Sequence, residues 1–404
     1  MIPLFKVNMT QEAITESAKV LGSGYIGQGP IVDKFEQRLS NYLKLPNFAN
    51  VVTTNSATAA EHMALHMLKK PSDLTKMYPE YGGANFDNWS GMGDGDEVLC
   101  TSLTCTATNW PVLANNFKIK WVDVDVNTLN MDLNDLRRKI TPKTKVIYFV
   151  HWGGYPVDLD EVEKIRAEVY DMYGFRPVVI EDCAHAFGSK YKGEYIGGHG
   201  NICTFSFQAI KHLTSVDGGM LITPYQEHYE RAKLLRWYGI DRDNNSKDFR
   251  CEADVEEWGF QFHMNDVNAS IGMANLKGID KIINRHKENG NYYNKHLKDV
   301  NGVTLLENKY DRESAYWIYS MKVDKHDKFM DWMKECGIMV SRVHERNDKH
   351  TCVKDYQTLL PNLDKVIKEM ICIPCGWWVT DEQREYIVDC IKTVSYTHLR
   401  AHET

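Results

Sequence analysis

Lys211 is the residue in this sequence whose position most needs a chemical explanation. It follows a short apolar run that ends at Phe207, and it precedes a turn that ends at the pair Gly218 and Gly219. Neither strand nor helix periodicity requires a cation at this point. One interpretation is an ordinary solvated lysine. The other is a buried amine with a lowered pKa, which can attack an aldehyde and form a Schiff base.

Polar side chains near other predicted strand ends could serve the same site. Asp182 closes the run "PVVIED", where a buried carboxylate is costly unless a cation faces it. The stretch "NSATAA" places Ser56, Ala57 and Thr58 at a predicted helix N-terminus, which can bind a phosphate. Ser206 can add a hydroxyl to that phosphate site. An amine, a carboxylate and an anion site are the three groups that pyridoxal phosphate (PLP) requires, so the sequence offers candidates for a PLP site.

The cysteines and histidines do not predict a metal site. The 10 cysteines and 15 histidines are dispersed along the chain. Cys372 and Cys375 form one C-x-x-C, but Pro374 lies inside it and no second ligand pair is near. Scattered thiols of this kind are typical of buried, reduced cysteines in a cytosolic protein. We therefore expect no metal.

The composition excludes several other classes of protein. Of the 404 residues, 43% are hydrophobic and 25% are charged, as in an ordinary globular protein. The net charge of -7 argues against nucleic-acid binding. No apolar run reaches the roughly 18 residues of a membrane span, and the N-terminus does not resemble a secretory signal. We expect a cytoplasmic protein with no nucleic-acid or membrane partner.

Strands and helices alternate through the first part of the chain. The predicted strands are 50–55, 96–102, 119–125, 145–151, 177–182, 202–207 and 218–223. Amphipathic stretches such as 159–174 lie between them. This pattern predicts an α/β fold with a mostly parallel sheet between layers of helices. Ligands of such sheets bind beyond the carboxyl ends of the strands, so Asn55, Thr104, Asp182 and Lys211 could converge there.

The alternation weakens after about residue 242. A long helical segment, 265–300, precedes the strand-like "YWIYSMKV" and the helix-like "KFMDWMKECG". We predict a large α/β domain over residues 1–241 and a smaller α+β domain over 242–393. Residues 394–404 do not continue the preceding pattern, and we interpret them as a non-native tail after a native end near Lys392. The loop "GYIGQG", the segment 70–94 and "HERNDKH" (344–350) are candidate walls of a substrate pocket.

Several ordered motifs give the chain a family resemblance. They include "GSGYIGQGPIVDKFE", "NSATAAEHMAL", "EDCAHAFGSKYKGEYIGGHGNICTFSF" and "KHLTSVDGGM". With these motifs, the chain from Ile2 to about Lys392 resembles the DegT/StrS-type nucleotide-sugar aminotransferases. These enzymes are PLP-dependent transferases with the type I fold of aspartate aminotransferase. The resemblance implies that fold, with a large domain and a smaller C-terminal domain.

The resemblance also implies roles for individual residues. Lys211 becomes the Schiff-base lysine and the base that transfers protons, and Asp182 becomes the partner of the pyridine nitrogen. His185 falls where relatives usually carry a glutamine beside the ring oxygen. Gln261, in "GFQFHMND", falls on a segment that in the family reaches the neighbouring subunit's site, which implies a homodimer. The residues that the resemblance assigns to the cofactor phosphate are Ala57, Thr58 and Ser206, beside Ser56 at the same helix N-terminus.

The chain departs from the family pattern at three positions. Cys105 stands where relatives usually carry an aromatic ring stacked on the cofactor, which leaves that stacking lost or supplied by another residue such as Trp110. Asp217 replaces the more common glutamate before the glycine pair. Gln261 replaces the common asparagine. These changes affect the grip on the cofactor and the fit of the substrate, and they leave Lys211 and Asp182 in place.

The implied reaction converts a nucleotide-linked keto sugar to an amino sugar, with L-glutamate as the donor in most relatives. Such products serve surface polysaccharide or glycoside biosynthesis. One alternative is a PLP-dependent sugar dehydratase, whose relatives carry histidine in place of the lysine; here His212 follows Lys211. Another is a non-catalytic regulatory protein of the same fold. The sugar, its nucleotide carrier and amination at C3 or C4 stay open.

Overall fold

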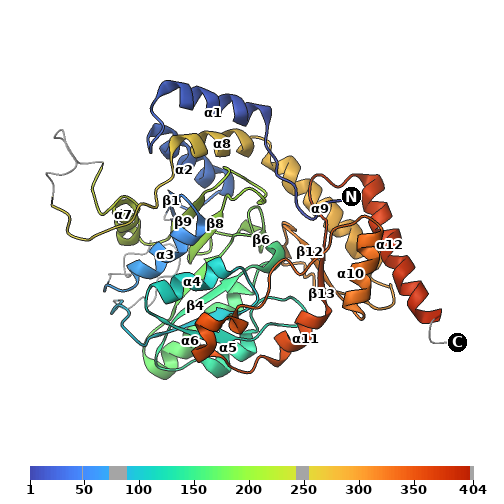
Figure 1. Cartoon of the computed structure of the whole chain (residues 1–404). Helices are drawn as coiled ribbons and strands as arrows, with labels where there is room; N and C mark the ends of the chain where they lie inside the picture. The colour runs from blue at the N-terminus through green and yellow to red at the C-terminus, as the bar shows by residue number, and fades with distance from the viewer. Residues whose placement is uncertain (48, 72–88, 243–253, 401–404) are drawn as a thin grey trace.

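The computed structural model of the chain describes residues 1–47, 49–71, 89–242 and 254–400 (Figure 1). Its main sheet has seven strands in the order β1-β9-β8-β5-β4-β2-β3. In chain order these strands are β1 (Asn50–Thr54), β2 (Glu97–Thr101), β3 (Lys118–Val122), β4 (Thr144–Val150), β5 (Val178–Asp182), β8 (Ile202–Ser206) and β9 (Gly219–Thr223). All of the strands predicted for this sheet are present. The strand β9 alone runs antiparallel to its neighbours β1 and β8.

Helices cover both faces of this sheet, which explains why its strands are apolar on both sides. One face packs against α3, α4 and α7, and its core includes Leu65, Val112 and Leu235. The other face packs against α2, α5 and α6, with Phe35 and Leu136 in its core. These helices are α2 (Pro30–Leu43), α3 (Ala57–Met67), α4 (Thr106–Ala114), α5 (Leu133–Lys139), α6 (Leu159–Tyr173) and α7 (Gln226–Leu235). The predicted α/β class with a mostly parallel sheet is confirmed.

A second, smaller sheet lies beside the first (Figure 1). Its antiparallel strands are β10 (Val303–Leu305), β12 (Tyr319–Val323) and β13 (Met370–Ile373), in the order β10-β12-β13. Its core cluster joins the strands to three helices. These helices are α9 (Ile279–Leu297), α10 (His326–Glu335) and α12 (Asp381–Arg400), and α11 (Pro361–Glu369) precedes β13. Short 3-10 turns occur at Trp152–Gly154, Asn347–Lys349 and Thr351–Tyr356.

Two segments pack against the part of the molecule to which the predicted domain division does not assign them. The predicted helical segment 265–300 is two helices, since α8 (Asp266–Leu276) ends before Gly278 and α9 begins at Ile279. The helix α8 packs against α1 (Gln11–Ser23) and α2. At the N-terminus, Ile2 forms a bridge with Ile338 of the smaller part. The domain boundary at residues 241 and 242 stays a prediction.

Other predicted segments have mixed outcomes. Residues 72–88 of the segment 70–94 lie outside the described residues, and Trp89 near its end donates its indole N–H to Leu68 O at 2.8 Å. The helix α12 continues to Arg400, past the point where the sequence pattern predicts the native end, and residues 401–404 lie outside the description. Among the described helices, none combines the length and the hydropathy that a membrane-spanning helix needs.

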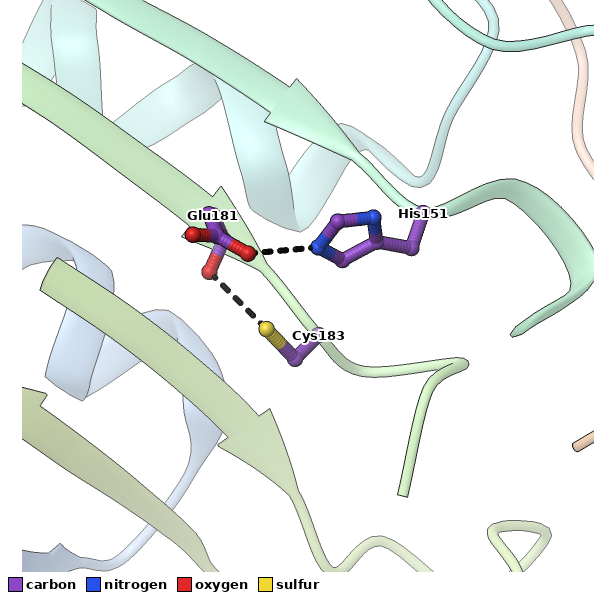
Figure 2. A group of neighbouring side chains, drawn as sticks. All are labelled: His151, Glu181 and Cys183. Carbon is purple, nitrogen blue, oxygen red and sulfur yellow. Dashed lines mark hydrogen bonds and ion pairs between the residues drawn. The ribbon is translucent and has the colours of Figure 1, made fainter. Parts of the chain in front are cut away.

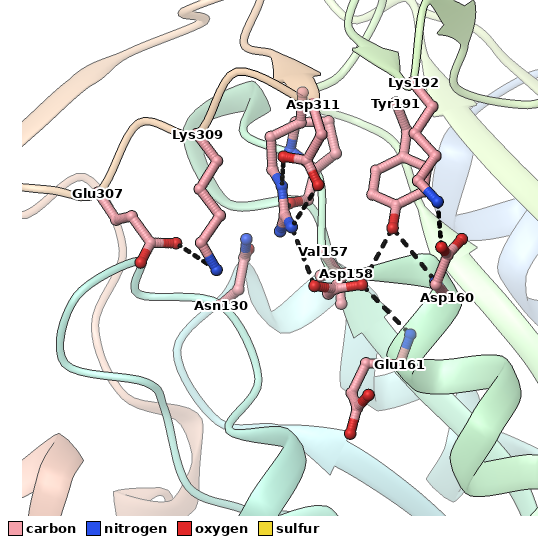
Figure 3. Close-up of polar contacts among 12 residues, drawn as sticks. Asn130, Val157, Asp158, Asp160, Glu161, Tyr191, Lys192, Glu307, Lys309 and Asp311 are labelled. Atoms are coloured by element: carbon pink, nitrogen blue, oxygen red, sulfur yellow. Dashed lines mark hydrogen bonds and ion pairs between the residues drawn. The ribbon is translucent and has the colours of Figure 1, made fainter.

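A network of polar contacts joins the segment before β12 to residues that follow the strands β4 and β5 of the large sheet (Figure 3). The short strand β11 (Arg312–Glu313) pairs with β6 (Lys190–Tyr191), which pairs in turn with β7 (Glu194–Tyr195). The guanidinium of Arg312 donates to Asp158 Oδ2 at 3.0 Å and to Asp311 Oδ1 at 3.0 Å. The Tyr191 hydroxyl donates to the other oxygen of Asp158 at 3.0 Å. These bonds hold the chain that continues to Trp317.

Candidate active site

A cavity of about 610 Å³ opens at the carboxyl ends of the parallel strands. This is the position expected for the ligand site of such a sheet, and the volume lies in the usual range for small-molecule sites. The residues assigned to the cofactor that line it are Ser56, Ala57, Thr58, Cys105, Asp182, His185, Ser206 and Lys211. Gln261 does not line it, and neither do Asn55 and Thr104, which were expected at the same strand ends.

Lys211 lies on the loop between β8 and β9, where its backbone N–H donates to Gln208 O at 2.9 Å. Its Nζ is 3.9 Å from the centre of the Trp317 ring. Burial lowers the pKa of the amine to about 8, although the nearby Asp182 carboxylate favours the charged form. About a tenth of the amine is therefore neutral at pH 7, far more than for an ordinary lysine, and the neutral form is the one that acts as a nucleophile or proton acceptor.

Asp182 is the last residue of β5 and is almost fully buried. Its Oδ2 accepts a hydrogen bond from Thr108 Oγ1 at 2.7 Å, and its Oδ1 accepts one from the backbone N–H of Ala184 at 2.9 Å. Burial raises the pKa of this carboxyl above its usual value, while the hydrogen bond from Thr108 lowers it. A cation facing the carboxylate would offset the cost of its burial. The protonated nitrogen of a pyridine ring is such a cation.

The N-terminus of α3 forms the candidate phosphate site. Ser56 caps the helix, because its Oγ accepts from the N–H of Ala59 at 3.1 Å. The first amide groups of the helix remain for an anion. Gly219 is pressed against this turn, since a Cβ there would lie 2.4 Å from Ala57 N. Ser206 is the residue of β8 that pairs with Gly219. The close packing thus brings the helix N-terminus and the Ser206 hydroxyl to one wall of the cavity.

His185 lies in a stack of rings on another wall. Its ring is nearly parallel to Trp317, with centres 3.9 Å apart, and to His344, with centres 5.4 Å apart. Burial, with the nearby charge of Lys211, holds the pKa of His185 well below its usual value, so the ring is neutral. Its Nδ1 has no hydrogen-bond partner among the described residues and could serve a bound ligand.

The segment "HERNDKH" reaches the site from the smaller part of the molecule, as the sequence predicts for a pocket wall. Asn347 donates its backbone N–H to Ser102 O at 2.9 Å and its side-chain amide to Cys105 O at 3.2 Å. The Ser102 hydroxyl donates to Asp348 Oδ1 at 2.6 Å. These bonds clamp the segment onto the loop after β2 and hold His344 at the cavity.

Some lining residues were not singled out individually by the sequence, among them Glu61, Trp317 and His344. Trp110, the candidate for the missing stacked ring, does not line the cavity, and its ring contacts His350 instead. Trp317 does line the cavity, and its ring lies over the Lys211 amine. The sequence could have indicated Glu61 as a lining residue, because it lies four residues after Ala57 and therefore on the same face of the helix.

Gln261 lies apart from the cavity of its own chain. Its carbonyl accepts from Asn55 Nδ2 at 3.0 Å, and its backbone forms a bridge with Trp237. Its side chain is exposed. The role that the resemblance gives to Gln261, a contact with the partner's phosphate, stays a prediction.

A buried group of titratable side chains, His151, Glu181 and Cys183, includes the two residues next to Asp182 in the chain (Figure 2). His151 Nε2 is 2.7 Å from Glu181 Oε2, and His151 Nδ1 accepts from the N–H of Val157 at 3.0 Å. Since Nδ1 accepts, Nε2 carries the hydrogen and donates it to Glu181. The thiol of Cys183 donates to Glu181 O at 3.5 Å. This arrangement uses both nitrogens of the ring, so it leaves His151 no free lone pair for a metal.

The residues present therefore fit PLP. The cavity offers a buried amine for the aldehyde, a buried carboxylate for the ring nitrogen and a helix N-terminus for the phosphate. When bound, PLP withdraws electrons from the carbon next to the amino group.

Comparison with known proteins agrees with this geometry. The model of the DegT/DnrJ/EryC1/StrS aminotransferase family matches residues 7–76 and 85–392. The protein MJ1066 of Methanocaldococcus jannaschii is 30% identical over 97% of this chain and 97% of its own length.

Solved structures, two of them described as sugar aminotransferases, superpose on the chain. AtS13 from Actinomadura melliaura is 46% identical, with a TM-score of 0.88, and the match covers 97% of this chain and 98% of that one. The sugar aminotransferase CalS13 from Micromonospora echinospora is 41% identical, with a TM-score of 0.87 and coverage of 97% and 100%. Spr1654 from Streptococcus pneumoniae, a putative sugar aminotransferase solved in its PLP form, is 26% identical, with a TM-score of 0.84 and coverage of 98% and 99%. The predicted resemblance and the type I fold are confirmed, and this chain belongs to the DegT/DnrJ/EryC1/StrS family of PLP-dependent sugar aminotransferases.

Proposed function

We propose that this sugar aminotransferase acts on a keto sugar attached to a nucleotide and takes the amino group from L-glutamate. The observation that carries the proposal is the position of the Lys211 amine and the Asp182 carboxylate in one buried cavity. Its products would enter surface polysaccharide or glycoside biosynthesis in the cytoplasm.

In this proposal Lys211 moves the proton. With PLP bound, its Nζ would take the α-proton of the amino donor and release it during the transfer, and it would move a proton in the opposite direction when the sugar is aminated. The pKa of about 8 allows Lys211 both to accept and to donate a proton, because both forms of the amine are populated near that pH. The ring of Trp317, 3.9 Å away, keeps water from one side of the amine.

The other lining residues hold the cofactor in place. Asp182 keeps a negative charge at the ring nitrogen, and Thr108 and Ala184 fix its two oxygens. The N-terminus of α3 and the Ser206 hydroxyl would bind the phosphate. His185 would offer its unpaired, neutral ring nitrogen Nδ1 to the cofactor.

The position of His212 favours transamination over the alternative dehydratase. A dehydratase of this fold would present a histidine to the cofactor in place of the lysine. Here the His212 Nε2 donates to Ala315 O at 3.0 Å, and this histidine does not line the cavity. Lys211 does line it. The same lysine argues against a non-catalytic regulatory protein.

The direct test is an assay of the purified, PLP-loaded protein with ¹⁵N-labelled glutamate and a panel of nucleotide-linked keto sugars. We expect transfer of the label to one class of sugar, detected by mass spectrometry, and no transfer by Lys211→Ala. Labelling of none of the panel would contradict the proposed substrate, and release of water from the sugar without labelling would support the dehydratase.

We further propose a homodimer in which Gln261 completes the partner's phosphate site. Lys211→Ala and Gln261→Glu, mixed under conditions of proven subunit exchange, should recover about a quarter of wild-type activity. Half of the dimers are then hybrids, and each hybrid has one intact site. A mixture with only the summed activity of its parents would refute the shared site.

A further inference from the structure

Glu61 is a buried acidic residue in the cavity that the mechanism above does not use. It lies one turn into α3, on the helix face of Ala57, and only 1% of its surface is exposed. It lines the cavity together with Asp182 and Lys211. Its Oε2 has no hydrogen-bond partner among the described residues. An ionised carboxylate in such a place would lose its hydration without compensation.

Burial and the facing charges together disfavour the ionised form of Glu61. From β5 the nearby Asp182 opposes a second negative charge, whereas from β4 the buried Tyr148 hydroxyl would favour ionisation by donating its hydrogen. The Tyr148 hydroxyl, however, has no hydrogen-bond partner among the described residues. Cys105 faces the carboxyl from the loop after β2, and Lys211 is the one facing cation in this part of the structure. Burial first, and Asp182 second, raise the pKa of Glu61 well above its usual value.

We propose that Glu61 is a second carboxyl group of the cofactor site, held protonated, so that Asp182 is the only anion that faces the cofactor ring. Glu61 is then a positioning residue, because it acts through Asp182. Two adjacent anions would compete for Lys211 and raise the amine's pKa, whereas one anion leaves it free to lose its proton. The neutral acid also supplies an O–H donor in the cavity beside Cys105, at the position without an aromatic ring.

The proposal deepens the proposed function, and its role for Asp182 rests on that function. Its test is carried out on the full chain without cofactor or substrate. Failure of the proposed sugar reaction would therefore leave the result on Glu61 standing, and failure of the test would leave the reaction standing.

The test compares urea unfolding of Glu61→Gln and the wild type between pH 5 and pH 8. A glutamate that stays protonated only in the folded protein destabilises it as pH rises above the ordinary glutamate pKa of about 4.3. Glutamine cannot ionise in either state. The folding equilibrium constant of Glu61→Gln, relative to wild type, should therefore rise about tenfold per pH unit until Glu61 ionises in the folded protein.

Glu168→Gln is the control, because Glu168 is a glutamate that pairs with Arg137, and an arginine keeps its charge throughout this pH range. The hydrogen bond and charge of Arg137 lower the pKa of Glu168. Glu168 is thus ionised in both the folded and the unfolded protein above pH 5, so the folding equilibrium constant of Glu168→Gln relative to wild type should stay constant with pH. A constant ratio for Glu61→Gln as well would overturn the proposal.

An infrared measurement on the wild type covers the case in which Glu61→Gln does not fold. Carbon-13 labelling of the glutamate side chains should reveal the carbonyl stretch of a protonated carboxylic acid at pH 7, shifted by the label. That band should vanish in Glu61→Met or in any folded neutral variant at this position. A wild-type spectrum without the band at pH 7 would refute the proposal.

Discussion

The substitution Asp182→Asn tests whether the charge, and not only the hydrogen bond, at the ring nitrogen matters. The structure indicates that the site can accept an asparagine without rearrangement. The side-chain carbonyl of the introduced asparagine can still accept from Ala184 N, as Asp182 Oδ1 does at 2.9 Å. Its amide can donate to Thr108 Oγ1, which can turn its own hydrogen to Thr104 Oγ1, 2.8 Å away. The variant should therefore fold and bind PLP.

The expected loss follows from the charge that disappears. A carboxylate beside a cation shifts a pKa by about 1–3 units, and each unit corresponds to about 1.4 kcal/mol. Without Asp182 the ring nitrogen of the cofactor loses that stabilisation of its proton, and the ring becomes a poorer acceptor of electrons. If the whole of this stabilisation of the protonated ring nitrogen is lost at the transition state, the half-reaction with glutamate slows by about 10- to 1,000-fold.

The assay is the single-turnover half-reaction with glutamate, followed by the absorbance of the bound cofactor. Asp160→Asn is a matched control, since Asp160 is an exposed aspartate on α6 that pairs with Lys192. It should react at the wild-type rate. A loss of less than tenfold in Asp182→Asn, with cofactor bound as in the wild type, would refute the argument from charge.

Three further predictions concern the same cavity. Lys211→Ala should lose the visible absorbance of bound PLP and all transamination while it unfolds cooperatively; retention of the absorbance would contradict the Schiff-base role. Gly219→Ala, whose new Cβ would lie 2.4 Å from Ala57 N, should lose about 1–3 kcal/mol of unfolding free energy and bind PLP more weakly. Gly198→Ala, with its nearest contact at 3.5 Å, is the control for that urea titration and should be nearly neutral. The rate of PLP capture by the cofactor-free protein should rise with pH and level off above about pH 8, because only the neutral Lys211 amine reacts; a rate that is flat from pH 6 to pH 9 in stopped-flow absorbance would contradict the lowered pKa.

The strands of the large sheet could be predicted because their signal is local. Short runs of Val, Ile and other apolar residues, bounded by turns, predict buried strands without knowledge of the partners. The antiparallel direction of β9 also had a signal. The loop from Ser206 to Gly219 contains no crossover helix, and parallel neighbours need one. The convergence of Asp182 and Lys211 followed from the rule that strand ends carry the site.

The contributions of the smaller part could be read from local patterns only in part, since the sequence indicated the segment "HERNDKH" as a pocket wall but not which side chains reach the amine. Trp317 and His344 follow no motif that points to the Lys211 amine, and only long-range packing brings them there. The break between α8 and α9 at Gly278 was missed for a related reason. Apolar periodicity continues across that glycine, while the packing of α8 on α1 decides where the first helix ends.

The environment of the Lys211 amine is thus built by distant segments. Trp317 lies over the amine because its indole N–H donates to Ile210 O at 3.0 Å, next to the lysine itself. The chain leading to it is held by the N–H of Ala315, which donates to Ser189 Oγ at 3.1 Å, and by the bonds of Arg312 to its neighbouring aspartates. Burial is the largest cause of the lowered pKa of Lys211, so these contacts set the fraction of neutral amine. The large sheet positions the reactive groups, and the smaller part adjusts their chemistry by excluding water from them.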